Sequence, residues 1–346
     1  MKSNQVTIKD IARELGISPS TVSRALKDHP DTSKETKRVV NELAKKLNYE
    51  PNTIALSLRS QRTRTIGVIV PEMVHYFFST IISGIEQVAY DAGYTVMFCQ
   101  SNESFDKEVL DTKALLSHRV DGLLVSVSSK TIDFDHFHEV QEREIPIVFF
   151  DRKPRGLKAS KVIIDDFEAA CMATQHLIDQ GCQKIAHLTG PANLQISRDR
   201  QEGYEKTLGK NGLQFDPNYV RDGGLGGESE GWEEGYNSMK ELLAIDVLPD
   251  GVFANNDVSA YGAMQAIKEA GLKIPDDIAV IGFSNWRFSA LVEPKLSTIL
   301  QPGLEIGKAA AKILIDHLDN KEDSGEPITK ILPTELIVRE SSMKKQ

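Results

Sequence analysis

Short apolar runs alternate with amphipathic stretches from Thr65 onward, and this alternation restricts the chain to a small set of folds. Each run is rich in β-branched or aromatic residues and is bounded by turn signals; the runs are TIGVIV, TVMFCQ, GLLVS, PIVFFD, KIAHLTG, GVFAN and IAVIGF. This pattern predicts strands of parallel sheets with helices covering both faces. Because these units extend over about 230 residues, which is long for one open sheet, we expect a body of two lobes.

The first fifty residues follow a different pattern, that of two short helices joined by a tight turn. In TIKDIARELGISPSTVSRAL, Thr7 is a good N-cap and Asp10 follows three residues later, as in a capping box. Gly16 supplies the left-handed residue that ends the first helix, and Ser18 with Pro19 suits the start of the second. This is the layout of a helix-turn-helix, whose second helix enters the major groove of DNA; a plain helical hairpin is the alternative.

The predicted second helix has polar side chains away from its apolar face. Arg24 can reach a guanine edge or a phosphate, and Ser20 and Thr21 can make shorter contacts. A third helix follows, for which we expect Thr32 as the N-cap and Glu35 as its partner in a second capping box. The sequence therefore predicts a small three-helix unit at the N-terminus.

Charge is distributed unevenly along the 346 residues. The first 64 residues hold 13 Lys and Arg against 7 Asp and Glu, a net charge of +6, whereas the whole chain has a net charge of -9, so the remainder carries -15. A small basic end on a large acidic body indicates a polyanion-binding module joined to something that does not bind polyanions.

Three motifs together resemble those of the lactose-repressor (LacI/GalR) family of bacterial transcription regulators. They are TIKDIARELGISPSTVSRAL, NYEPN and IGVIVP, and the resemblance covers essentially the whole chain. It implies a homodimer that binds double-stranded, near-palindromic operator DNA and changes its affinity when a small molecule binds the core. By position, Pro19, Ser20 and Arg24 match residues that read bases in the family. The residues expected to contact DNA are Thr7, Ser18, Pro19, Ser20, Thr21, Ser23, Arg24, Asn52, Ala55, Leu58 and Arg59.

The stretch between the two parts is more apolar and more basic than a simple linker. Asn52 can cap a helix of one to two turns that ends near Arg59, with Ile54, Ala55 and Leu58 on one face. So short a helix is unstable alone, but two copies can pack together as they bind DNA. The resemblance implies that this is the hinge helix and that Leu58 wedges into the minor groove. The alternatives are that Leu58 packs on the headpiece, or that the stretch is only a tether.

The resemblance also implies a periplasmic-binding-protein-like core whose two lobes are linked by three crossings of the chain. We expect a headpiece at 1–50, a hinge and linker at 51–64 and a core at 65–346. The N-lobe would comprise about 65–163 and 292–327, and the C-lobe about 164–291 and 328–346. The crossings are then expected near Ile163–Asp165, Ser289–Leu296 and Ile328–Leu332.

Ligands of such sheets bind beyond the carboxyl ends of the strands, here between the lobes. Asp151, Arg200 and Asn256 match the family's effector contacts, whereas Ser284 and Asn285 stand where sugar-binding members commonly have Asp. The residues expected to bind the effector are Tyr76, Phe78, Asp151, Arg198, Arg200, Asn256, Ser284, Asn285 and Trp286. Other polar or aromatic residues near strand ends are His75, Phe77, Asn193, Ser197, Asn255 and Asp257. In Gly223–Gly231 the match is poor, and either Glu230 or Trp232 could line the pocket.

Catalytic and cofactor motifs are absent from the sequence. It contains no GxSxG, HExxH or GxxxxGK[ST], and its three cysteines form no CxxC pair. The histidine spacing that comes closest to a metal-ligand pattern is that of His136 and His138, and this pair is expected on an exposed helix face. We therefore expect no enzyme, no cofactor and no bound metal. The polar N-terminus and the lack of a long apolar run predict a cytoplasmic, nucleoid-associated protein with no membrane partner.

Several functional alternatives remain open at this stage. The effector is expected to be a sugar or a sugar derivative, with a nucleobase-type effector or control by a protein partner as alternatives. A pure solute-binding protein is a third class, which the basic headpiece argues against. Whether the effector raises or lowers DNA affinity is not readable from the sequence. We expect a dimer rather than a tetramer, because Glu326–Gln346 carries no leucine heptad.

Overall fold

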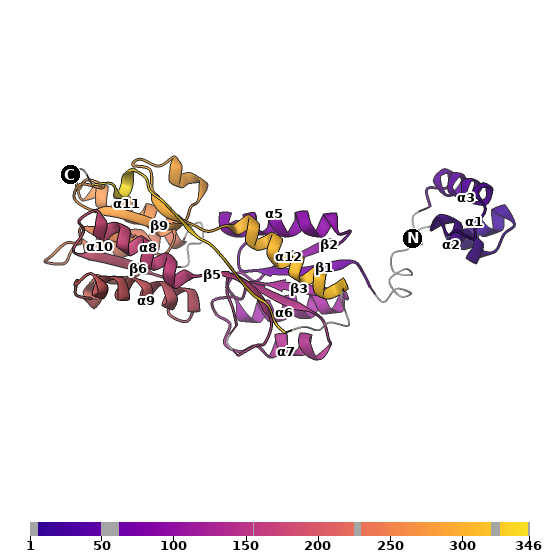
Figure 1. Ribbon diagram of the computed structural model, residues 1–346, viewed down its shortest axis with the longest axis horizontal. Helices are drawn as coiled ribbons and strands as arrows, with labels where there is room; N and C mark the ends of the chain where they lie inside the picture. Colours follow the sequence, from indigo (N-terminus) through magenta and orange to yellow (C-terminus); the bar gives the residue numbers. More distant parts are fainter. Residues whose placement is uncertain (1–5, 50–61, 155, 225–229, 320–325, 345–346) are drawn as a thin grey trace. The chain divides into compact units, whose positions relative to one another are not determined.

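The computed structural model describes residues 6–49, 62–154, 156–224, 230–319 and 326–344, and the chain divides into two compact units, Met1–Thr63 and Arg64–Gln346 (Figure 1). Each unit is described below by itself. No helix among the described residues is both long and apolar enough to cross a membrane.

The first unit contains the helix-turn-helix that the sequence predicts. Helices α1 (Ile8–Leu15), α2 (Pro19–Leu26) and α3 (Lys34–Lys46) enclose a small core of Ile11, Ala12, Val22, Ala25, Val40 and Ala44. The backbone N–H of Thr7 donates to the Asp10 carboxylate at 2.9 Å, and Gly16 has a φ of 65° at the end of α1. The Ser18 hydroxyl accepts from the Thr21 N–H at 3.1 Å, so the predicted start of α2 is confirmed.

The predicted cap of the third helix is wrong by one residue. Ser33, not Thr32, accepts the backbone N–H of Thr36 at 3.1 Å, and Thr32 is itself buried. Both residue types cap helices well, so burial of the Thr32 side chain decides which of the two stays free to do so. Glu35 forms an ion pair with Arg38 at 2.7 Å instead of closing a capping box.

The second unit holds two six-stranded sheets, which define an N-lobe and a C-lobe (Figure 1). The N-lobe sheet has the order β11-β5-β4-β3-β1-β2 and every pairing in it is parallel. Its strands are β1 (Thr65–Val70), β2 (Thr95–Gln100), β3 (Gly122–Val125), β4 (Ile147–Phe150), β5 (Ser160–Ile164) and β11 (Thr329–Leu332).

Helices cover both faces of the N-lobe sheet, because its strands are apolar on both sides. Ile66 and Val68 pack in the cluster shared with α5 (Tyr76–Asp91) and α12 (Gly303–Asp319). Ile69 packs in the opposite cluster with α6 (Phe105–Ser117) and α7 (Asp135–Glu142). His136, expected on an exposed face of α7, is buried, with its Nε2 3.1 Å from the buried Glu108 carboxylate.

The C-lobe sheet has the order β12-β10-β9-β8-β6-β7, in which only the pairing of β12 with β10 is antiparallel. Its strands are β6 (Ile185–Thr189), β7 (Val220–Asp222), β8 (Gly251–Ala254), β9 (Ala279–Ser284), β10 (Ser297–Leu300) and β12 (Glu335–Ile337). Its main helices are α8 (Asp166–Asp179), α9 (Gln195–Lys210), α10 (Glu230–Leu242) and α11 (Asp257–Glu269). Short 3-10 helices lie at Pro217–Tyr219, Arg287–Ala290 and Glu340–Ser342.

Two of the three expected lobe crossings lie too early in the sequence. The first falls between β5 and α8, as expected. The second follows Leu300 rather than ending at Leu296, because β10 still pairs with β9 in the C-lobe sheet. The third follows Leu332, because β11 pairs with β5 in the N-lobe sheet before β12 joins the C-lobe. Each displaced crossing results from a short strand that the sequence reading did not identify.

The return helix α12 packs on α5 through glycines. A Cβ on Gly307 would lie 2.1 Å from the backbone oxygen of Ile81, and a Cβ on Gly84 would lie 2.2 Å from that of Leu304. The two backbones therefore approach too closely for any side chain at these positions. This contact fixes the position of the helix that follows the second crossing.

Candidate functional site

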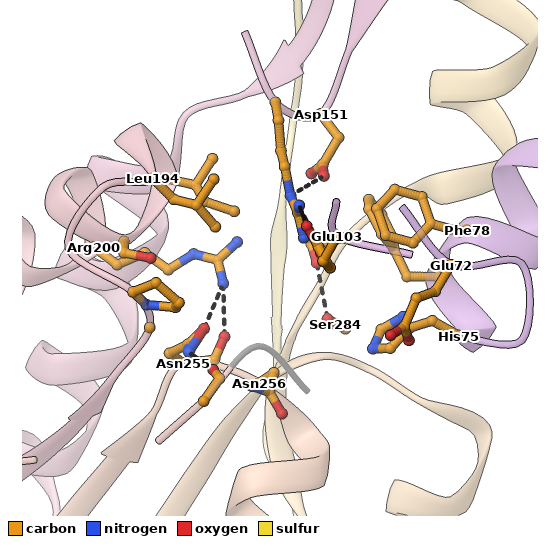
Figure 2. A pocket seen from close by; sticks show the side chains of 18 residues that line it. Glu72, His75, Phe78, Glu103, Asp151, Leu194, Arg200, Asn255, Asn256 and Ser284 are labelled. Atoms are coloured by element: carbon orange, nitrogen blue, oxygen red, sulfur yellow. Dashed lines mark hydrogen bonds and ion pairs between the residues drawn. The ribbon is translucent and has the colours of Figure 1, made fainter. Parts of the chain in front are cut away.

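A cleft of about 610 Å³, counted out to its open mouth, lies between the lobes where strand ends meet. Figure 2 shows Phe78, His75 and Glu72 approaching from one side and Leu194, Arg200 and Asn255 from the other. Such a position, beyond the carboxyl ends of parallel strands, is the usual ligand site of α/β sheets.

The structure brings together five of the nine residues expected to contact an effector. Those that line the cleft are Phe78, Asp151, Arg200, Asn256 and Ser284, together with the strand-end residues His75, Phe77, Ser197 and Asn255. The four that lie outside its lining are Tyr76, Arg198, Asn285 and Trp286. Sequence proximity to a strand end therefore identified the region but not which side chains face the cavity.

The four outlying residues have other contacts. The Arg287 guanidinium lies over the Tyr76 ring at 6.0 Å, and the Asn285 side chain accepts from Arg339 at 2.8 Å. Arg198 donates to the backbone oxygen of Ala192 and lines a neighbouring cavity that Asn193 also lines.

Trp286 contacts a residue of the cleft without lining the cleft itself. Its ring stacks on His75 with centroids 6.1 Å apart, so it joins the C-lobe to the N-lobe beside the cavity. The buried Asp257 carboxylate accepts from the Trp286 backbone N–H at 2.6 Å and from the hydroxyls of Ser289 and Thr298 at 2.7 and 2.6 Å. Burial raises the pKa of Asp257 to about 6. Asp257 thus organises the loop that carries Trp286 and does not itself line the cleft.

Asp151 is a cleft acid whose carboxyl is strongly affected by burial. It follows β4 with a φ of 59°, a left-handed conformation that Asp tolerates better than most residues. Burial raises the pKa of its carboxyl to about 6, and the guanidinium of Arg152 only partly opposes this rise. Arg152 Nε lies 3.8 Å from Oδ2, and no described residue donates a hydrogen bond to this carboxylate. A buried carboxylate left in this state is suited to accept hydrogen bonds from a ligand.

An ion pair between Arg152 and Glu103 forms one wall of the cleft. Arg152 Nη1 donates to both Glu103 oxygens at 2.8 and 2.9 Å, and both side chains are largely buried. Neither residue was predicted from the sequence, although Glu103 follows β2 and Arg152 follows Asp151. The strand-end rule could have found Glu103. Glu72 and Gln301 were missed as well, and Gln301 directly follows β10, a strand that was not predicted.

Arg200 is held rigidly on the C-lobe side. Its Nε and Nη2 contact one oxygen of the buried Asp166 at 2.8 and 2.7 Å, and its Nη1 donates to the Asn255 backbone oxygen at 2.6 Å. Its guanidinium also lies 3.7 Å from the centroid of the Phe283 ring. These contacts fix the orientation of the guanidinium before any ligand arrives, so little entropy would be lost in using it.

Asn256 has both a structural contact and a free donor. Its Oδ1 accepts the Ser259 N–H at 2.8 Å and so caps α11. Its Nδ2 is buried and has no hydrogen-bond partner among the described residues. The fixed oxygen aims the amide N–H₂ group, which leaves a donor available at the cleft.

The remaining predictions on the C-lobe rim concern Gly223–Trp232. The Asn255 amide donates to the Gly224 backbone oxygen at 3.0 Å, and Gly224 lines the cleft. Trp232 stacks on Tyr236 at 5.3 Å and is not part of the lining. The side chain of Glu230, like residues 225–229, falls outside the described part of the chain.

The headpiece presents the polar face of α2 to solvent. Ser20 and Arg24 are exposed, and Arg24 Nε donates to the Ser20 backbone oxygen at 3.4 Å. Ser18 shares hydroxyl contacts with Ser20 and Thr21 at 2.7 and 2.8 Å. Thr7 is exposed at the start of α1 and Ser23 is half-buried. Asn52, Ala55, Leu58 and Arg59 lie outside the described residues, so the hinge-helix prediction stays a prediction.

A helix-turn-helix joined to a two-lobed core with a polar cleft defines a transcription regulator with a ligand-binding core. The profile "Bacterial regulatory proteins, lacI family" matches residues 7–52, and "Periplasmic binding protein-like domain" matches residues 174–342. The chain belongs to the LacI family of bacterial transcriptional repressors.

Named relatives and solved structures match this chain over nearly its full length. The HTH-type transcriptional repressor PurR of Haemophilus influenzae (strain PittEE) is 35% identical over 339 residues, covering 97% of this chain and 98% of its own. Catabolite control protein A of Priestia megaterium is 31% identical over 338 residues, or 97% and 99%. The lac repressor dimer bound to operator and the anti-inducer ONPF superposes with a TM-score of 0.86 at 26% identity, covering 98% and 100%. The complex of transcriptional regulator CelR with cellobiose gives 0.72 at 28%, covering 97% and 100%.

Proposed function

We propose that the chain acts in the cytoplasm as a homodimeric repressor of a near-palindromic operator, controlled by a sugar-type effector in the interlobe cleft. Two headpieces would insert their α2 helices into successive half-sites, with Arg24 and Ser20 at the base edges. The hinge helix, with Leu58 at the centre of the operator, would couple lobe movement to DNA affinity.

One observation carries the choice of effector: three complementary groups face the same cavity. They are a carboxylate that receives no hydrogen bond from the described residues, an amide N–H₂ group with no acceptor among them, and an aromatic ring. Asp151 offers an acceptor, Asn256 Nδ2 offers a donor, and Phe78 offers an apolar face. A sugar presents adjacent hydroxyls, which both donate and accept, around an apolar ring face. Each polar group of the cleft would find its complement on such a ligand.

The solved relatives support this assignment by analogy. CelR is described in complex with cellobiose, and a LacI-family regulator from Enterococcus faecium with bound ribose has 30% identity and a TM-score of 0.70. The lac repressor is described as a dimer bound to operator, which supports the proposed assembly.

A nucleobase is the second candidate effector, favoured by the full-length relatives named PurR. A planar base would bind between the Phe78 ring and an apolar surface opposite, for which Leu194 is available across the cleft (Figure 2). It would present fewer hydroxyl donors to the Asp151 carboxylate than a sugar does. Control by a protein partner would leave the cleft empty, and the buried Asp151 would then have no ligand to offset its cost.

A thermal-shift panel of sugars, sugar derivatives and nucleobases on the full chain tests the proposal. We expect at least one sugar to raise the unfolding temperature and to change operator affinity in a gel-shift titration. The variant Asn256→Asp keeps the helix cap but removes the donor, so it should lose the sugar response while the protein remains folded. Stabilisation by nucleobases alone would replace the sugar effector with the second candidate.

A further inference from the structure

A second cavity opens directly beside the effector cleft. It spans about 770 Å³, counted to its mouth, and shares Arg152, Leu194 and Ile196 with the cleft as a common wall. Its other walls come from the segment after β3 in the N-lobe and from the start of α9 in the C-lobe. Nothing in the effector site described above uses this space, which we call the cationic compartment.

The two cavities differ in the sign of their charged side chains. Among the described residues, Arg152, Lys153 and Arg198 line the cationic compartment and no carboxylate does. The cleft is instead lined by three carboxylates, those of Glu72, Glu103 and Asp151, against two guanidinium groups. An anionic group would be repelled from the carboxylates of the cleft and attracted by the neighbouring compartment.

Arg152 sits on the boundary with unused hydrogen-bonding capacity. Its Nη1 is engaged by Glu103 and by the Val127 backbone oxygen at 3.2 Å, while its buried Nε has no hydrogen-bond partner among the described residues. The side chain is 7% exposed. A buried guanidinium N–H without an acceptor is costly, and guanidinium geometry matches that of phosphate and carboxylate oxygens.

The local fold adds neutral donors to the same compartment. Leu194 occupies the N-cap of α9, and its side chain cannot accept the first N–H groups of this 16-residue helix. Such N–H groups favour anions at a helix N-terminus. Lys153 is partly held by Asp199, with its Nζ 3.9 Å from Oδ2, a distance longer than a hydrogen bond. Its side chain is 34% exposed, which leaves the ammonium accessible to a ligand.

We propose that the effector carries an anionic substituent of the phosphate class, which occupies the cationic compartment while the hydroxylated part of the molecule lies in the cleft. This inference rests on the proposed function and specifies its ligand. Arg152 contacts the phosphate from the shared wall, Lys153 contacts it from the N-lobe, and the first turn of α9 contacts it from the C-lobe.

Residues of both lobes line the compartment, so a group bound there would contact both lobes. The Asn193 amide donates to the Ser129 backbone oxygen across the interlobe boundary, and the Ser129 N–H donates to Glu103 at 2.6 Å. Glu103 in turn holds Arg152. A phosphate bound to Arg152 and to the first turn of α9 would bridge the lobes alongside these hydrogen bonds. It would therefore favour the lobe arrangement in which both contacts can form.

The test compares neutral and phosphorylated members of matched pairs on the full chain, by calorimetric titration. The pairs are a hexose and its 6-phosphate, ribose and its 5-phosphate, and a purine nucleoside and its 5′-monophosphate. We expect the phosphorylated member of one pair to bind at least about tenfold more tightly than its neutral partner. The pair that responds identifies whether the phosphate comes with a sugar or with a nucleotide.

Lys153→Gln separates a phosphate contact from a general effect on folding. It should weaken binding of the phosphorylated member by roughly three- to tenfold and leave the neutral member unchanged, since it removes one partly screened charge. Lys210→Gln, at the exposed end of α9, is the matched control and should change neither. Raising salt from about 0.05 to about 0.5 M should weaken only the phosphorylated member.

Two outcomes overturn the inference, and they are distinguishable from failure of the proposed function. Equal affinity for the neutral and phosphorylated members, or equal effects of Lys153→Gln on both, would show that the compartment holds no anion while the cleft still binds a sugar. If no member of any pair binds, the sugar-effector proposal fails together with this one.

Discussion

Replacing Asp151 by Asn should stabilise the ligand-free protein while weakening effector binding. The carboxylate is buried at the cleft, receives no hydrogen bond from the described residues, and has a pKa raised by burial from 3.8 to about 6. Asn has nearly the same shape and tolerates the left-handed φ of 59° found at this position. The variant therefore removes the charge without requiring a new backbone conformation.

The size of the effect follows from the shift in the pKa of Asp151. One pKa unit corresponds to 1.36 kcal/mol, so a rise from 3.8 to about 6 costs the folded state about 3 kcal/mol when the carboxyl is ionised. This cost is fully present above the folded pKa, near 6, and disappears as the pH falls toward 3.8, because the folded protein then binds the proton more tightly than the unfolded chain. Asp151→Asn should therefore gain about 3 kcal/mol at pH 7.5 and almost nothing near pH 4.

Urea unfolding of the full chain, followed by the fluorescence of Trp232 and Trp286, measures the free energy of unfolding at pH 7.5 and near pH 4. The difference in unfolding free energy between wild type and Asp151→Asn should shrink as the pH is lowered from 7.5 to about 4. Asp250→Ala is a useful contrast, because Asp250 accepts the backbone N–H groups of Gln183 and Lys184 at 2.8 to 3.0 Å. Its loss should destabilise the protein by about 2 kcal/mol.

The reasoning would be refuted if Asp151→Asn destabilised the ligand-free protein at pH 7.5. Such a result would mean that the attraction of Arg152 outweighs burial and that Asp151 is a structural ion-pair partner. It would also remove the argument that the Asp151 carboxylate accepts hydrogen bonds from the hydroxyls of a ligand.

Four further predictions concern DNA binding and packing. Arg24→Ala should reduce discrimination between operator and random DNA at least about tenfold, measured by fluorescence anisotropy, and leave effector binding intact. Leu58→Gly should weaken operator affinity in the same assay while sparing the effector; unchanged affinity would make the 51–64 stretch a tether. Gly307→Ala should cost about 2 kcal/mol or more in thermal unfolding, because its Cβ would lie 2.1 Å from the Ile81 backbone oxygen. Gly209→Ala, which meets nothing within 4 Å on α9, should instead stabilise by about 0.5–1 kcal/mol.

Most of the strands that were predicted from the sequence are central strands of a sheet. Thr65–Val70 coincides with the buried β1, because parallel central strands are apolar nearly throughout. Thr95–Gln100 coincides with β2, which is an edge strand and only partly buried. The missed strands β5, β7, β10, β11 and β12 are three to five residues long and contain polar residues. The sheet membership of the last three depends on partners far away in the sequence, and the expected lobe crossings were displaced for that reason.

The site was predictable at the level of strand ends but not of side-chain direction. Asp151 and Asn256 directly follow β4 and β8 or nearly so, and both line the cleft. Tyr76 and Phe78 lie two residues apart at the start of α5, yet only Phe78 reaches the cavity. Which of them points inward is set by how α5 packs on α12, through contacts between segments more than 200 residues apart.

The most direct test of the account is the coupling between effector and operator in one titration series. Operator affinity of the full chain is measured by anisotropy without and with a saturating effector, and effector affinity is measured without and with operator. If cleft and reading helices are parts of one switch, both affinities should change by the same factor, typically about 5- to 150-fold, since coupling is reciprocal. A ligand that occupies the cleft, as shown by its loss in Asp151→Asn, yet leaves operator affinity unchanged would contradict the account.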